Sequence, residues 1–564
     1  ASMPLKDWRA AKYKADVRLS SGKFLSKSHP INADRIAGEF EIEAQGDKAI
    51  HVDLHSFQAG IGATDLVLDG GKFATTDGNS NWKLTELLGR LDIGQGIAAL
   101  DRVKLHGRLK FTASASGPTQ IPKDATILSV VKHELVAYPV DMAIQPPIYP
   151  SPVGHITGGP IRFQGGVVRF ENLSGDYGGD KVVLDDGHIT LDDPRQKLQL
   201  QDLRRQVRIE GIIGTLICRQ PGPMYPASLG KVVAQLRPTG PFAISGWYAI
   251  NRKLPGEIAR PKGDYFFRVS TAGGAFALTD RMAPLTDIRA DATVSPMLVD
   301  IVRLRGKTLG GEVIAATQFT PGHPMRYAGM ATFYNVNLET AWRELGPPTK
   351  APLAGVAYFK IRGSGVGRGG TISPLQAVAA EGEFEIVDGN FGDISAIRAA
   401  AKPVSKADQT LDGRAAGVFS LRDEKVTLSN CVVGNPLYGL QGSGTIGFNK
   451  ALDLHVVAAP LGDWQLALKQ NNASGLANIA AAIQQVFNGA QHLLLYDVHV
   501  TGPATHPTVA APTPVPIITA PIAAIFGQLI GGSKDSKLID QLRTRNDGSG
   551  QDAQAAQADA PKSK

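Results

Sequence analysis

The sequence has very little cysteine and few aromatic residues. Only two of its 564 residues are cysteine, Cys218 and Cys431, and Phe, Trp and Tyr together make up 7%. Two cysteines cannot form a disulfide framework, and their separation in the chain excludes a CxxC metal-binding pair. Because both lie in apolar, strand-like runs, we expect them to be buried free thiols.

Long apolar runs are also missing. No stretch of about 20 residues is apolar enough to form a membrane-spanning helix, and no signal peptide is recognisable. The chain begins at Ala1 and passes directly into Trp8 and Arg9. We therefore expect a segment whose targeting element or membrane anchor lies outside this sequence.

A strong charge bias is absent as well. Lys and Arg number 59 against 52 Asp and Glu, which gives a net charge of +7 and a pI of about 9.1. The basic residues are scattered rather than clustered with aromatic residues, so the pattern argues against nucleic-acid binding. A solvated basic surface is the first interpretation, and attraction to anionic lipid headgroups is the alternative.

Motifs of known enzyme chemistry do not occur. Residues 365–370 fit the pattern G-x-G-x-x-G, but Pro374 stands where the helix of a dinucleotide-binding fold would begin. The histidines are dispersed, and the adjacent His133 and Glu134 would point to opposite faces of a strand. We therefore expect no catalytic residue, no cofactor and no metal site.

The sequence does contain period-two alternation, which is typical of strands with one apolar and one polar face. In residues 103–115, apolar side chains alternate with histidine, lysine and arginine. The same pattern recurs at residues 334–338, 353–362, 452–456 and 496–501. Glycine is abundant, with 63 residues, and suits tight turns between strands. The fold class predicted is therefore mostly β, with long antiparallel strands.

A longer repeat suggests that a β module was duplicated. Val167 and Val299 each begin an apolar segment, and a Gly-Gly pair follows each of them eleven residues later. Looser copies begin at Val52 and Val426. This spacing predicts four related modules, at residues 1–118, 119–258, 259–370 and 371–515.

Helical patterns are few. Residues 338–345, 391–401 and 474–489 fit short helices, and residues 517–530 fit an amphipathic helix within a terminal segment at 516–545. This last helix is too short to span a bilayer, so docking on the sheet and lying on a membrane surface both stay open. The polar tail at residues 546–564 is predicted to be disordered.

This shortage of helices leaves the apolar faces of the strands without an obvious cover. A sheet must bury its apolar face against helices, a second sheet or itself. Sheets also twist and coil, and Gly107 and Gly355 on the apolar face would allow tight curvature. Two architectures remain: an elongated, curved sheet with a taco-like apolar groove, or a series of β-sandwiches.

Residues 383–460 favour the groove, because they resemble the C-terminal region of AsmA-like proteins. The similar features are a strand that ends at Asp388-Gly389, a short helix, a charged turn at residues 422–425, a G-x-G-x-I strand at residues 442–446 and a Leu-Asp-Leu strand at residues 452–454. A last strand from Val498, followed by Pro503 and Pro507, is also similar. The resemblance extends over about residues 353–510.

The resemblance implies a function in lipid transport. The family, which includes the AsmA, TamB and YhdP types, is understood as inner-membrane-anchored proteins of the bacterial periplasm whose β-groove carries phospholipid toward the outer membrane. It therefore implies a periplasmic, membrane-associated protein that binds or conducts acyl chains and supports outer-membrane homeostasis. Its partners would be phospholipid and either a membrane surface or a separate membrane anchor.

The side chains expected to line the groove lie on the apolar faces of the predicted strands, where acyl chains would be held by burial. They are Val103, Leu105, Leu109, Phe111, Phe359, Ile361, Phe384, Ile386, Leu454 and Val456. Core packing is the alternative role for each of them. The alternative function is a structural or assembly factor of the cell envelope, built from stacked β-sandwiches without lipid.

Overall fold

The computed structural model describes residues 12–25, 32–45, 49–76, 80–95, 104–120, 130–145, 152–190, 206–219, 237–251, 263–276, 283–320, 325–345, 353–367, 378–404, 412–434, 438–460 and 495–515. The chain divides into two compact units. Unit 1 consists of Ala1–Thr349 and Lys360–Ala379, and unit 2 consists of Lys350–Phe359 and Ala380–Lys564.

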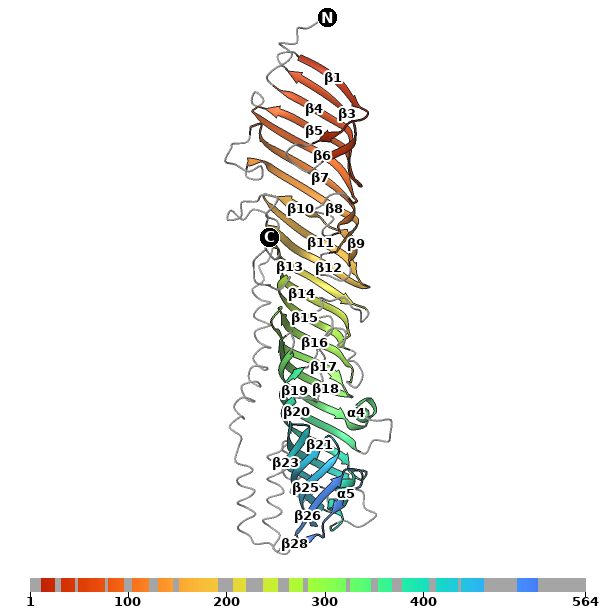
Figure 1. Ribbon diagram of the computed structural model, residues 1–564, viewed down its shortest axis with the longest axis vertical. Coiled ribbons are helices and arrows are strands. Elements are labelled where there is room, and N and C mark those ends of the chain that lie inside the picture. Colours follow the sequence, from red (N-terminus) through yellow and green to blue (C-terminus); the bar gives the residue numbers. More distant parts are fainter. Residues whose placement is uncertain are drawn as a thin grey trace, which may run out of the picture. The chain divides into compact units, whose positions relative to one another are not determined.

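The protein is mostly β, as the sequence predicts, and its antiparallel strands form a long sheet (Figure 1). The strands of unit 1 are β1 (Lys12–Leu19), β2 (Phe24–Leu25), β3 (Asn32–Gln45), β4 (Ile50–Ile61), β5 (Thr64–Thr76), β6 (Asn81–Ile93), β7 (His106–Pro118), β8 (Lys132–Ile144), β9 (Val153–Gly158), β10 (Ile161–Gln164), β11 (Val167–Tyr177), β12 (Asp180–Thr190), β13 (Gln206–Cys218), β14 (Pro238–Asn251), β15 (Gly263–Phe276), β16 (Leu285–Val294), β17 (Val299–Thr308), β18 (Gly311–Thr320) and β19 (Met325–Asn337).

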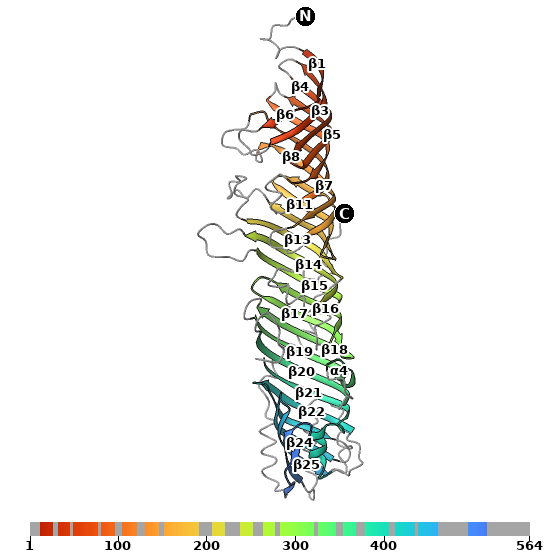
Figure 2. The ribbon, with the colours of Figure 1, turned by 45° about the vertical axis from the view of Figure 1, so that its right-hand side comes forward.

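Neighbours in the chain are neighbours in the sheet over most of unit 1. Antiparallel pairing runs from β3 through β8 and from β11 through β19, and Figure 2 shows the same succession from a second side. Two places depart from this order. β1 pairs with β3, and the short strands β9 and β10 both lie between β8 and β11. Apart from these two places, the strands follow one another in the sheet in chain order, as hairpin connections between antiparallel strands produce.

The alternating strand predicted at residues 103–115 begins later than expected. β7 starts at His106, because Lys104 has a left-handed backbone with φ of +46°, and Val103 lies outside the described residues. From His106 to Thr112 exposed and half-buried residues alternate, with Leu109 and Phe111 on the half-buried face. The predicted start was therefore wrong, whereas the two faces of the strand are confirmed.

Copies of the sequence repeat form β-hairpins. β11 and β12 meet at Gly178-Gly179, β17 and β18 meet at Leu309-Gly310, and β4 and β5 are joined through Gly62. All four glycines have positive φ, which glycine adopts without the steric penalty of a side chain. The repeat therefore marks the turns of hairpins, and duplication of whole modules stays a prediction.

Many strands contain one extra residue relative to their partner. In β6, Leu84 pairs with Ala115 and Leu87 pairs with Ala113, so β6 advances three residues while β7 advances two. Comparable shifts occur in β3, β16, β21 and β23, and each contains a residue with φ near +50°. These residues are Arg35, Glu86, Asp287, Asp388 and Asn430. Such bulges bend a strand and increase its twist.

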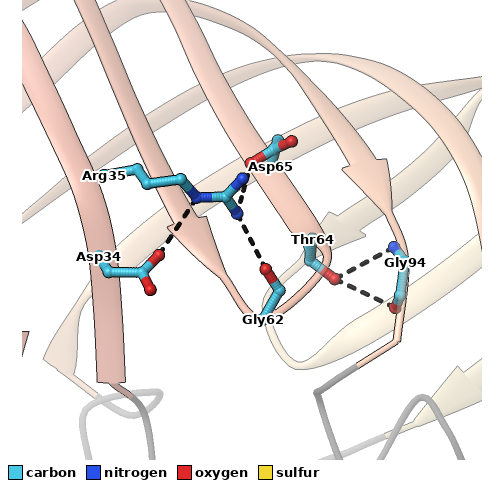
Figure 3. A network of polar contacts seen from close by, with 6 residues as sticks. All are labelled: Asp34, Arg35, Gly62, Thr64, Asp65 and Gly94. Carbon is cyan, nitrogen blue, oxygen red and sulfur yellow. Dashed lines mark hydrogen bonds and ion pairs between the residues drawn. The ribbon is translucent and has the colours of Figure 1, made fainter.

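The bulge residue Arg35 also holds the rim of the sheet in unit 1 (Figure 3). Its guanidinium donates a hydrogen bond of 2.9 Å to the carbonyl oxygen of Gly62 and forms an ion pair of 3.0 Å with Asp65. Beside it, the buried hydroxyl of Thr64 donates to the carbonyl oxygen of Gly94 and accepts from its amide, both at 3.2 Å. Successive strand ends from β3 to β6 are thereby linked.

One part of the apolar face of unit 1 forms a buried cluster. Ile288 of β16, Leu304 of β17 and Val313 of β18 are buried, and apolar side chains of β15 and β19, among them Phe276 and Phe333, pack around them. The cluster is therefore formed by side chains of neighbouring strands of one sheet.

Unit 2 contains the rest of the sheet. Its strands are the first part of β20 (Ala354–Gly367), β21 (Val378–Asn390) from Ala380 onward, β22 (Asp412–Arg422), β23 (Lys425–Gly434), β24 (Tyr438–Gly447), β25 (Ala451–Pro460), β26 (Leu495–Pro503), β27 (Thr508–Val509) and β28 (Thr513–Val515). β21 to β26 pair in chain order, and β27 and β28 both pair with β26.

The structure describes two helices of the three shorter ones predicted. α4 (Leu338–Leu345) has the predicted bounds and begins where Asn337 accepts a 2.8 Å hydrogen bond from the amide of Thr340. α5 (Ser395–Ala401) begins later than the predicted residue 391, because Asn390 accepts a hydrogen bond from the amide of Gly392 and forms a turn there.

Several predicted segments lie outside the described residues. They are the helices at residues 474–489 and 517–530, the terminal segment at 516–545 and the tail at 546–564. Among the residues that the structure describes, no helix has the length and apolar character needed to cross a bilayer.

The first prediction concerns Gly107, which has φ of +117° on the half-buried face of β7. A Cβ atom at this position would meet the carbonyl oxygen of Asp141 in β8, so Gly107→Ala should destabilise this region by about 1–3 kcal/mol. Hydrogen–deuterium exchange should therefore accelerate in β6 to β8. Gly154→Ala is the matched control, because a Cβ there has open space. Equal exchange in both variants would contradict the strain assigned to Gly107.

Candidate functional site

An apolar pocket of about 230 Å³ lies between α5 and the sheet of unit 2. We call it the α5 pocket. Its lining consists of Leu353, Phe384, Ile386, Phe391, Ile394, Ala396, Ile397, Ala400, Ala415, Leu428, Cys431, Val432, Val433, Leu440, Gly442, Ser443, Leu454 and Val456. No carboxylate, amine, guanidinium or imidazole group is among these side chains. The pocket is therefore suited to hydrocarbon rather than to a charged ligand.

The sheet side of the pocket depends on a bulge in β23. Leu428 pairs with Gly444 and Cys431 pairs with Gly442, so one extra residue lies between them, and Asn430 has φ of +51°. In a regular strand, residues three apart point to opposite faces. Because of the bulge, Leu428 and Cys431 both line the pocket.

Small residues in the sheet leave room for the larger side chains of the pocket. A Cβ atom at Gly417 of β22 would lie only 2.9 Å from the ring of Phe384 and would also clash with the Cys431 sulfur. A Cβ at Gly442 would lie 2.8 Å from the carbonyl oxygen of His455. Glycine at these two positions therefore lets Phe384, Cys431 and Val456 pack closely at the wall of the pocket.

The helical side is formed by α5 and the turn before it. α5 packs against β24 to β27 (Figure 1). Ala396, Ile397 and Ala400 of this helix line the pocket. Phe391 is almost completely buried. Arg398 donates a hydrogen bond of 2.8 Å from Nε to the carbonyl oxygen of Gly392, which ties the turn to the helix.

The pKa of the Cys431 thiol reflects the apolar surroundings of the pocket. Burial raises the pKa of its thiol to about 11, although a backbone hydrogen bond at Val418 acts in the opposite direction. The thiol is therefore protonated at neutral pH and behaves as an apolar side chain. Both cysteines are free, as the sequence predicts, but only Cys218 is fully buried, whereas Cys431 is partly accessible.

The structure brings four of the ten predicted groove residues together. Phe384 and Ile386 of β21 and Leu454 and Val456 of β25 all line the α5 pocket. The other described residues do not line it: Leu105, Leu109, Phe111 and Ile361 are half-buried in unit 1, and Phe359 is half-buried in unit 2. Val103 lies outside the described residues.

Several pocket residues were absent from the predicted set. Ile394 and Ile397 are three residues apart, which is the spacing of one helical face, so the pattern of residues 391–401 contained a usable signal. Leu428 and Cys431 gave no such signal, because alternation alone places them on opposite faces.

Comparison with protein-family models and with curated proteins finds no match for this chain.

One group of metal-ligating side chains occurs in the part of the chain that the structure describes. Asp453 and His455 of β25 and His499 of β26 have ligand atoms within 4.8 Å of one another. Leu454 and Val456, which alternate with them along β25, line the α5 pocket. The cluster and the pocket therefore occupy opposite faces of the same strand.

The second prediction concerns the reactivity of Cys431. With a pKa of about 11, about one thiol in a thousand is ionised at pH 8, against about one in four for an ordinary cysteine with a pKa near 8.5. Alkylation by iodoacetamide at pH 8 should therefore be about 250-fold slower than for a free thiol of ordinary pKa, with glutathione as the reference. Peptide mass spectrometry separates Cys431 from Cys218, and unfolding in urea should restore the ordinary rate. Alkylation of native Cys431 as fast as glutathione would contradict its apolar environment.

Proposed function

We propose that this chain binds the hydrocarbon part of lipids, with the α5 pocket as the site that holds an acyl-chain segment. The observation that carries the proposal is a pocket of about 230 Å³ in which none of the described lining residues has a charged side chain. Apolar cavities of about 150 Å³ bind benzene-sized guests, whereas sites for drug-sized ligands begin near 300 Å³. The pocket therefore fits a stretch of one acyl chain, and the headgroup would stay in solvent.

Burial supplies the binding energy in this proposal. Each methylene group removed from water contributes about 0.8 kcal/mol, and the protein needs no polar group to hold it. Phe384, Leu454 and Val456 would contact the chain, because they line the pocket without being fully buried. Lipids with different headgroups would bind similarly.

The apolar face of unit 1 supports a second contact region. Leu109 and Phe111 on β7 are half-buried, and α4 is the one helix that the structure describes in this unit. Between β15 and β19 apolar side chains are already buried in the cluster around Ile288, so lipid contact is proposed for the region of β7 and not for that cluster.

The resemblance of residues 383–460 to AsmA-like proteins supports the same function. Phe384 and Val456 lie near the two ends of this segment, and both line the pocket. On this basis we extend the proposal to a phospholipid-transporting protein of the bacterial periplasm that is associated with a membrane. The competing proposal is a structural factor of the cell envelope whose pocket is simply a packing defect.

The experiment that tests the function is native mass spectrometry of the purified full chain with identification of bound lipid. Lipid-loaded protein is expected, and Val456→Asp should reduce the loaded fraction at least about tenfold, because an unpaired carboxylate next to hydrocarbon costs more than about 1.4 kcal/mol. Val457→Asp is the matched control, because Val457 is exposed on the other face of β25. Lipid-free wild-type protein, also after exposure to phospholipid vesicles, would favour the structural factor.

Filling the pocket tests the proposal without adding charge. Ala396→Phe on α5 should weaken the binding of a fluorescent fatty acid about tenfold, because the new ring occupies space that the acyl chain needs. Ala399→Phe makes the same change at a residue of α5 that does not line the pocket, and its affinity should stay near that of the wild type. Circular dichroism of both variants checks that the fold is retained. Equal affinities in all three proteins would place the fatty acid elsewhere.

A further inference from the structure

The outer face of β25 and β26 brings together three side chains that are typical ligands of transition metals. His455 and His499 are direct partners in the antiparallel ladder, and Asp453 lies two residues before His455 on the same face. The imidazole rings stack, with centroids 4.1 Å apart and an interplanar angle of 11°. Nε2 of His499 lies 2.7 Å from a carboxylate oxygen of Asp453.

The spacing of these groups is close to that of a tetrahedral metal site. The ligand atoms all lie within 4.8 Å of one another. Zinc binds nitrogen and carboxylate oxygen at about 2.0–2.2 Å, so the ligand atoms of a tetrahedral site are about 3.3 Å apart. Asp453 and His499 would separate slightly and His455 would approach. The two imidazole rings are stacked almost parallel, so at least one ring must turn to bind the ion. Asp453 and His455 are exposed, which leaves their side chains room to rotate.

We propose that Asp453, His455 and His499 form a binding site for a divalent transition-metal ion of the class that prefers imidazole, with Zn²⁺ as its representative. The ion takes the place of the Nε2 proton that His499 donates to Asp453, and this proton moves through solvent to Nδ1, so that the bound imidazole is neutral. Two imidazole nitrogens and one carboxylate oxygen bind the ion, and water fills the fourth position.

A further observation supports this assignment. Val498 and Val500 on either side of His499 are completely buried, which fixes the backbone of β26 at the site. Ligands on well-anchored strands are held more exactly than ligands on loops.

The test is calorimetric titration of the chelator-treated full chain with Zn²⁺, followed by Co²⁺ absorption spectroscopy. One ion should bind per chain, and Co²⁺ should show the visible bands of tetrahedral coordination. His455→Ala and His499→Ala should each weaken Zn²⁺ binding by about 100-fold or more, since even outer partners of metal ligands contribute 10- to 100-fold. Zn²⁺ should raise the unfolding temperature of the wild type but not of these variants.

Two matched controls separate a built site from general attraction of cations. Asp497→Asn removes an equal charge two residues before His499 but outside the cluster, and should leave affinity unchanged where Asp453→Asn weakens it. His155→Ala removes a histidine that lies 3.2 Å from Asp141 but belongs to no such cluster, and should also have no effect. The proposal is overturned by absent binding, by binding that survives both histidine substitutions, or by equal effects of Asp453→Asn and Asp497→Asn. None of these outcomes depends on lipid binding.

Discussion

The structure depends on keeping the apolar side chains of each strand on one face although the strands are bulged. A regular strand keeps its faces by strict alternation, and one extra residue would reverse them. Here the extra residue takes a left-handed conformation, and the apolar residues on its two sides are spaced by three instead of two. Leu84 and Leu87 in unit 1 and Leu428 and Cys431 in unit 2 show this arrangement. The strands are thereby bent while the apolar residues on the two sides of each of these bulges stay on one face.

The α5 pocket follows from this constraint combined with the choice of small residues. α5 presents Ala396 and Ala400 to the sheet, and the sheet presents Gly417 beneath Phe384 and Cys431. A larger side chain at Ala396 or Ala400 would extend into this space. The pocket therefore depends on small residues of α5 facing the sheet.

Much of this fold is predictable from the sequence, because alternation and turn glycines are local signals. The two faces of β7, the hairpin at Gly178-Gly179 and the bounds of α4 follow from such signals. The bulges are not predictable in this way, since Asn430 has a sequence context that suits an ordinary strand as well. The candidate site was therefore only partly found. Residues of regular segments such as Leu454 were recognised, whereas Cys431, which reaches the pocket only through a bulge, was not.

The metal-ligating cluster shows a second limit of sequence reading, because it depends on register. Asp453 and His455 are close in the chain, but only the pairing of His455 with His499 completes the group. Asp453 and His455 lie on one face of β25, and Leu454 and Val456 lie on its other face, where they line the pocket. An ion that joins β25 to β26 would restrain the wall on which the proposed acyl chain rests, without contacting the chain itself. Alternation along β25 would thus couple the two proposed sites through one backbone, since neither face of a strand can shift unless the other shifts with it.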